Sequence, residues 1–167
     1  MIMPQATPPL WLCYLTPRLL PFVWIADFIL CSAALSLALK AMKKPAEEGH
    51  YARNIVKVWV FTYFGQALGT LLMLLSAGID FVLTGTQAGA FWSSAVTNWV
   101  AFNPLGSIPA LLWVLASLFA SGFLIYLFIT KFALVSDEYT HGAKKRIALT
   151  LVLFASPYLF LVPTVLI

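Results

Sequence analysis

The stretch RLLPFVWIADFILCSAALSLALKAMKK, residues 18–44, decides the fold class of this chain. It is almost entirely apolar, and it ends in a basic cluster formed by Lys40, Lys43 and Lys44. A helix needs about 20 predominantly apolar residues to cross the hydrocarbon core of a bilayer. We therefore predict a first membrane-spanning helix over residues 21–39.

The composition of the whole chain agrees with a lipid environment. Of its 167 residues, 62% are hydrophobic and only 10% are charged, whereas soluble domains carry about 25% charged residues. The mean hydropathy is +0.93. The length suits one small bundle, so we expect a single transmembrane domain over residues 1–167.

Three further segments with almost no charge predict the rest of an all-α, four-helix transmembrane bundle. The second span is expected over residues 55–79 and the third over residues 108–130. The fourth is expected over residues 147–167, bent at Pro157 and Pro163, because proline removes a helical hydrogen bond. Each segment is close to the length that a bilayer requires.

The basic residues predict the orientation of the bundle. Nine of the ten Lys and Arg residues lie within segments 40–57 and 131–146, and only Arg18 lies elsewhere. Because Lys and Arg are concentrated in cytoplasmic loops, both segments should face the cytoplasm. Both termini should then be non-cytoplasmic, in a plasma or inner membrane.

The same basic residues predict contacts with the lipid bilayer. The formal net charge of +4 does not indicate nucleic-acid binding, because the charges lie between apolar spans. Anionic lipid headgroups are their expected partners. The residues expected to meet these headgroups are Lys40, Lys43, Lys44, Lys144, Lys145 and Arg146.

Residues 87–102 predict an amphipathic helix at the outer membrane interface. Apolar residues that include Trp92 and Trp99 fall on one helical face, and Ser, Thr and Asn residues fall on the other. Amphipathic helices and tryptophans are both typical of the headgroup region. Residues 1–20, which are rich in proline and carry aromatic side chains, are also expected at the interface.

One acid, Asp27, lies within the first span, where a charge is costly and points to a function. Counted from the outer end of each span, its depth matches polar residues of the other spans. Two interpretations stay open: a pathway for a proton or cation, or a structural acid that is hydrogen-bonded or paired with Arg18. The members of this predicted polar cluster are Asp27, Gln66, Thr70, Ser117 and Tyr158.

Small residues predict close helix packing. Gly65 and Gly69 form a GxxxG pattern in the second span, and Ala120 lies on a small-residue face of the third. Such faces let membrane helices approach closely. We expect them to serve helix packing or association, in a homo-oligomer or with partner membrane subunits.

His50 and His141 are weak candidates for metal ligands. They are the chain's two histidines, both lie at the membrane edge, and neither belongs to a pattern with ligand spacing. We expect no metal and no cofactor. Cys13 and Cys31 are too far apart along the chain to pair if the segment between them is helical.

The sequences around the two histidines are similar. They are compatible with two repeated helical hairpins or with two unrelated loops that start helices alike.

No nucleophile motif, phosphate-binding loop or paired carboxylate site occurs in the chain, so the sequence does not indicate an enzyme. The leading functional hypothesis is a small channel- or transporter-like protein for an ion or small solute. The alternative is a non-catalytic accessory or assembly subunit of a larger membrane complex.

Overall fold

The computed structural model describes residues 9–41, 48–134 and 140–164, and the side chains of residues 48–50, 52 and 53 lie outside that description. All regular secondary structure within these residues is helical. The four longest helices are α1 (Leu20–Ala41), α2 (Glu48–Val82), α5 (Ile108–Phe128), which continues into the π-helical turn η4 (Ile129–Ala133), and α6 (His141–Ala155).

Three helical stretches of the described chain are long and apolar enough to cross a membrane. They are Leu20–Ala41, Asn54–Val82 and Ile108–Ala133, and they contain the first three predicted spans. Their outer faces carry large apolar side chains, including Phe22, which is 71% exposed, and Phe119, which is 74% exposed. Such continuous apolar cover is typical of surfaces that face lipid.

The fourth predicted span differs from the structure. α6 begins at His141 and ends at Ala155, so residues 147–167 do not form one continuous helix. Ser156 takes an extended conformation because the following proline, Pro157, clashes with a helical residue before it. A short 3₁₀ helix, η5 (Tyr158–Leu161), follows the break.

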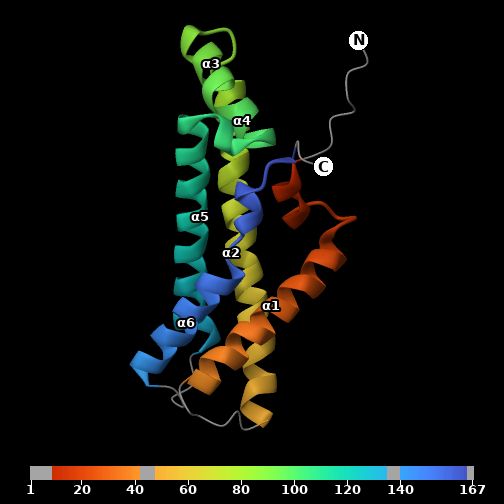
Figure 1. The fold of residues 1–167 in the computed structure, drawn as a ribbon, viewed down its shortest axis with the longest axis vertical. Helices are drawn as coiled ribbons and strands as arrows, with labels where there is room; N and C mark the ends of the chain where they lie inside the picture. The colour runs from red at the N-terminus through yellow and green to blue at the C-terminus, as the bar shows by residue number, and fades with distance from the viewer. Residues whose placement is uncertain (1–8, 42–47, 135–139, 165–167) are drawn as a thin grey trace.

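The four long helices pack around one another in an up-down order. Figure 1 shows α2 and α5 side by side along the long axis, with α1 and α6 crossing them obliquely. Each long helix contacts the next along the chain, and α6 also packs against α1. This closed arrangement is the usual topology of a helical bundle with short connections.

The basic segments meet at one end of this bundle. Lys40 lies in the last turn of α1 and Lys131 in the last turn of η4, while Lys144–Arg146 lie near the start of α6. These helix ends lie at the bottom of Figure 1, which we call the basic end. Lys43 and Lys44 lie outside the described residues.

The opposite end carries the predicted amphipathic helix. α2 has 35 residues and is about 52 Å long, which exceeds the ~30 Å of a hydrocarbon core. The turn after α2 uses a left-handed glycine, Gly85, with a φ of 84°. The chain then folds back over α2 and α5, through α3 (Gln87–Trp92), the π-helical turn η2 (Ser93–Thr97) and α4 (Asn98–Phe102).

The N-terminal segment is tucked into the bundle. Within the 3₁₀ helix η1 (Leu10–Tyr14), Trp11 is 5% exposed and Tyr14 is 6% exposed. The Trp11 indole donates a hydrogen bond of 3.1 Å to the Val100 carbonyl, and the Tyr63 hydroxyl donates one of 2.7 Å to the Tyr14 carbonyl. Buried carbonyl and apolar partners therefore hold these two aromatics within the protein.

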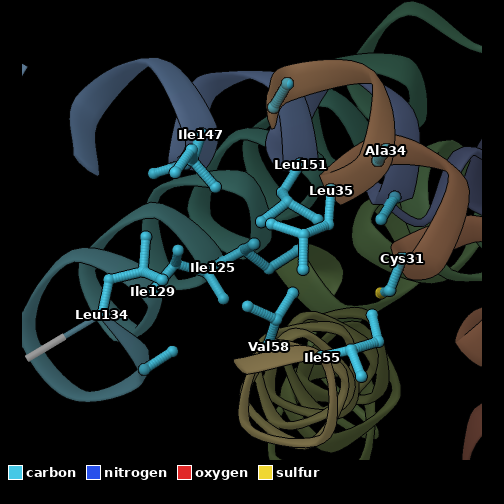
Figure 2. Packing of buried hydrophobic residues seen from close by; sticks show 14 of the residues in the cluster. Cys31, Ala34, Leu35, Ile55, Val58, Ile125, Ile129, Leu134, Ile147 and Leu151 are labelled. Carbon is cyan, nitrogen blue, oxygen red and sulfur yellow. The ribbon is translucent and has the colours of Figure 1, made fainter. Parts of the chain in front are cut away.

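Buried apolar side chains form two clusters along the bundle. The basic-end cluster is shown in Figure 2 and includes Cys31, Leu35, Val58, Ile125, Ile147 and Leu151. The far-end cluster includes Trp11, Tyr14, Met73, Val100, Val114 and Phe160. The functional candidates lie where these two clusters meet.

Candidate functional site

Asp27 of α1 and Gln66 of α2 face each other inside the bundle. Only 4% of Asp27 and 2% of Gln66 is exposed. Gln66 Nε2 donates a hydrogen bond of 2.7 Å to Asp27 Oδ1. Arg18 precedes α1 and is exposed. The hydrogen bond to the Asp27 carboxylate comes from the Gln66 amide.

The end of α6 lies beside this pair. The break at Ser156 and Pro157 removes the next turn of helix, so the last carbonyls of α6 have no helical N–H donors. Gln66 Nε2 donates its second hydrogen bond, also 2.7 Å, to the Ala155 carbonyl. The amide of Gln66 thus joins α1, α2 and α6 at one point.

Two further carbonyls of the last turn of α6 are satisfied by hydroxyl groups. Ser156 Oγ donates to the Val152 carbonyl, and the Tyr158 hydroxyl donates to the Leu153 carbonyl, each at 2.5 Å. Because buried backbone groups need partners, these bonds stabilise a helix end in an apolar environment.

The orientation of the Gln66 amide follows from its neighbours. The Ala155 carbonyl can only accept, so the NH₂ side of the amide must face it. Gln66 Oε1 and Asp27 Oδ2 are both buried, and neither has a hydrogen-bond partner among the described residues. An unpaired buried oxygen is costly, so each of these acceptors can bind a water molecule or a cation, and the carboxylate can also bind a proton.

A layer of buried polar side chains separates the two apolar clusters. Along α1, Asp27 lies one turn from Val23, which packs on the far-end cluster, and one turn from Cys31 of the basic-end cluster. The same order holds along α2 and α5, where buried polar residues lie between members of the two clusters. These residues are Thr62, Gln66, Thr70, Ser117 and Ser121.

A cavity of about 340 Å³ adjoins the layer between α1 and the break of α6. Asp27 and Gln66 line it together with two tyrosines, Tyr14 of η1 and Tyr158 of η5. The remaining lining is mostly apolar. The cavity therefore gives the acid and the amide a hollow that a small solute or several water molecules can occupy.

The structure brings together part of the predicted polar cluster. The predicted residues that line the cavity are Asp27, Gln66 and Tyr158. Thr70 is buried and donates to the Gln66 carbonyl one turn earlier, at 3.0 Å. Ser117 is also buried, but it donates to the Trp113 carbonyl of its own helix and does not line the cavity.

Three components of the site were absent from the predicted cluster. The Ala155 carbonyl has a sequence signal, because Pro157 two residues later indicates unpaired carbonyls at a helix end. Ser156 has the same signal, because it directly precedes Pro157. Tyr14 has none, since nothing in a proline-rich segment indicates which side chain turns inward.

The small residues of α2 pack against α5 of the same chain. A Cβ atom on Gly65 would lie 2.5 Å from Ile125 Cγ1, and one on Gly69 would lie 2.6 Å from Ser121 Cβ. Ser121 Oγ also donates a hydrogen bond of 3.0 Å to the Gly65 carbonyl. The GxxxG face thus has an intramolecular partner, and Ala120 is half-buried beside it on α5.

The two predicted interfacial tryptophans have different surroundings. The Trp92 indole donates to the Ser76 carbonyl at 3.0 Å, and its ring meets Trp113 edge-on at 5.5 Å. Trp99 is 37% exposed, and its ring covers Gly106, where a Cβ atom would clash with it.

The structure describes the surroundings of one of the two metal-site candidates. His141 is exposed as the first residue of α6, and the side chain of His50 lies outside the described part of the chain. No group of three or more His, Cys, Asp or Glu residues gathers within the described ranges. Cys13 and Cys31 are both free thiols.

Comparison with known proteins adds no functional assignment to this geometry. No protein-family model matches the chain, and neither a curated protein nor a solved structure shows significant similarity to it.

Proposed function

We propose that this chain is a small membrane transporter for a proton or a small monovalent cation, which binds at Asp27. One observation carries the proposal: the Asp27 carboxylate and the carbonyl end of α6 meet inside the bundle through Gln66. In membrane transporters, broken-helix ends and unwound carbonyls are used to coordinate Na⁺ or H⁺ near the middle of the bilayer.

The charge balance of the site favours a cation. A carboxylate and a helix C-terminus both carry negative charge or partial charge. The side chain that binds Asp27, Gln66, is neutral. A proton or a monovalent cation would compensate the carboxylate, whose Oδ2 atom lacks a partner within the described ranges.

The surrounding packing favours a carrier over an open pore. The basic-end cluster beyond the polar layer is tightly filled, with Leu35, Val58, Ile125 and Leu151 all 1% exposed or less. An ion would therefore need a rearrangement of helices to leave toward the basic end. Rocking of one part of a bundle about a fixed site is the general form of alternating access.

The membrane topology we propose has four crossings, with α6 and η5 together making the last one. α6 starts at the basic end, and the chain after η5 reaches η1, where the Leu10 N–H donates to Thr164 Oγ1 at 3.3 Å. A broken helix is tolerated at membrane depth where its free backbone groups are satisfied by protein. The basic end is placed in the cytoplasm, with both termini outside.

The proposal is tested by reconstituting the full chain in liposomes and measuring proton, Na⁺ and K⁺ flux under imposed gradients. We expect flux above that of empty vesicles for one of these ions, and its loss in Asp27→Asn. Asp80→Asn is the matched control, because it makes the same change at the far end of α2. The proposal fails if Asp27→Asn conducts like the wild type, or if no gradient drives flux above empty vesicles.

A second candidate function is an accessory subunit of a membrane complex, and the far-end tip of the molecule favours it. Phe81, Val82 and Phe91 are 82%, 78% and 64% exposed. Phe81 lies about 36 Å along α2 from Lys57, beyond the ~30 Å hydrocarbon core if Lys57 marks its inner edge. A partner that co-purifies with the wild type but not with Phe81→Ser/Phe91→Ser would support this role, whereas a chain recovered alone would oppose it.

A further inference from the structure

A second cavity lies on the other side of α6 from the Asp27 site. It is a groove of about 830 Å³ between α5 and α6. Its exposed rims are Phe119 and Phe123 on α5 and Leu149 and Leu153 on α6. The lining is almost wholly apolar, so the groove suits a hydrocarbon chain rather than a polar solute.

Gly122 forms the floor of this groove. A Cβ atom there would lie 3.2 Å from Val152 Cγ1 and 3.5 Å from Ser156 Oγ. Because glycine has no side chain, α5 and α6 approach closely at this level while the groove above them stays open. The hydroxyl groups of Ser156 and Tyr158, at the far end of the groove, are occupied in hydrogen bonds to α6 carbonyls.

Two cations lie just beyond the other end of the groove. Lys145 and Arg146 are exposed and precede Leu149 by four and three residues. Residues three and four apart share one face of a helix, so both cations lie one turn from the groove, on its side of α6. This end of the groove is also the basic end of the bundle.

We propose that the α5–α6 groove is a binding site for an anionic glycerophospholipid. One acyl chain lies between the rims formed by Phe119, Phe123, Leu149 and Leu153, and the phosphate lies on Lys145 and Arg146. Charge complementarity selects the anionic headgroup, since Lys and Arg beside a membrane attract acidic lipids. The groove shares the lining residues Ser156 and Tyr158 with the Asp27 cavity, but neither Asp27 nor Gln66 lines it.

The experiment is a native mass-spectrometry titration of the full chain in detergent with dioleoyl phosphatidylglycerol and with dioleoyl phosphatidylcholine. We expect retention of one phosphatidylglycerol molecule in preference to phosphatidylcholine. Lys145→Gln/Arg146→Gln should abolish this preference. Lys57→Gln/Lys131→Gln, which removes equal charge near the same end from α2 and η4, should preserve it.

A second pair of variants tests the groove. Leu153→Trp narrows it and should weaken phosphatidylglycerol binding, whereas Leu112→Trp, on a lipid-facing position of α5 outside the groove, should not. Glycerol 3-phosphate, which offers the headgroup charge without a chain, should not compete at equal concentration. Monodispersity and thermal unfolding in detergent show that each variant is folded.

Four results would overturn the site. Equal retention of the two lipids would remove the role of charge. Equal losses in the two charge variants would reduce it to a general surface attraction. Unchanged binding in Leu153→Trp, or competition by glycerol 3-phosphate, would show that the acyl chain does not lie in the groove.

Discussion

The amide of Gln66 donates a 2.7 Å hydrogen bond to the carboxylate of Asp27, which lies 39 residues earlier in the chain. The same nitrogen donates a second hydrogen bond to the Ala155 carbonyl at the end of α6. One neutral side chain thereby connects an intramembrane acid to a broken helix. The first prediction concerns the stability that this connection supplies.

Gln66→Leu should destabilise the fold, because it leaves Asp27 Oδ1 and the Ala155 carbonyl without donors. Each stranded acceptor should cost about 1–3 kcal/mol. Reversible unfolding in mixed micelles measures the loss. In Asp27→Leu/Gln66→Leu the acid is gone, so the double variant should lose less than the sum of the two single losses. Additive losses would mean that the hydrogen bond contributes nothing.

The α2–α5 contact should be highly sensitive to side chains at Gly69. Gly69→Val must displace Ser121, whose Cβ would lie 2.6 Å from the added Cβ atom. We expect a loss of about 1–3 kcal/mol from overpacking. Gly78→Ala, on the same helix with nothing within 4 Å of its Cβ position, is the control. It should be neutral or more stable by up to about 1 kcal/mol, from helix propensity; equal losses would disprove the close approach.

The N-terminal helix η1 should contribute to the core. Trp11→Ala removes a buried ring and its hydrogen bond to Val100, so we expect a loss of about 3–5 kcal/mol. Phe22→Ala removes an aromatic side chain that is 71% exposed, and should cost well under 1 kcal/mol. Thermal unfolding in detergent compares the two. Similar small effects would place Trp11 outside the core.

Single-cysteine labelling tests the proposed topology. In a Cys13→Ser/Cys31→Ala background, Gln87→Cys and Val162→Cys should react with an impermeant maleimide in intact cells, because both lie toward the non-cytoplasmic end. Lys145→Cys should react only after permeabilisation. If Val162→Cys behaves like Lys145→Cys, the chain crosses the membrane three times and α6–η5 is not a crossing.

Much of the architecture follows from one-dimensional patterns in the sequence. Predominantly apolar runs of bilayer length predict helices, because the backbone in lipid must satisfy its own hydrogen bonds. The runs so predicted lie within α1, α2 and the continuous stretch of α5 and η4. The basic clusters mark helix ends that the structure gathers at one end of the bundle. Pro157 likewise marks an interruption of the last helix, although its result, a helix that starts earlier and stops at Ala155, was not predicted.

Only the tertiary structure decided which side chains and which helices contact one another. The rise per residue gives the depth of Asp27, Gln66 and Tyr158, but the direction in which each points depends on how the helices rotate and tilt against one another. The GxxxG pattern similarly predicts a close approach without naming α5 as the partner. Packing between distant segments turns Trp11 inward and brings Gln66 to the Ala155 carbonyl. No local sequence pattern encodes either contact.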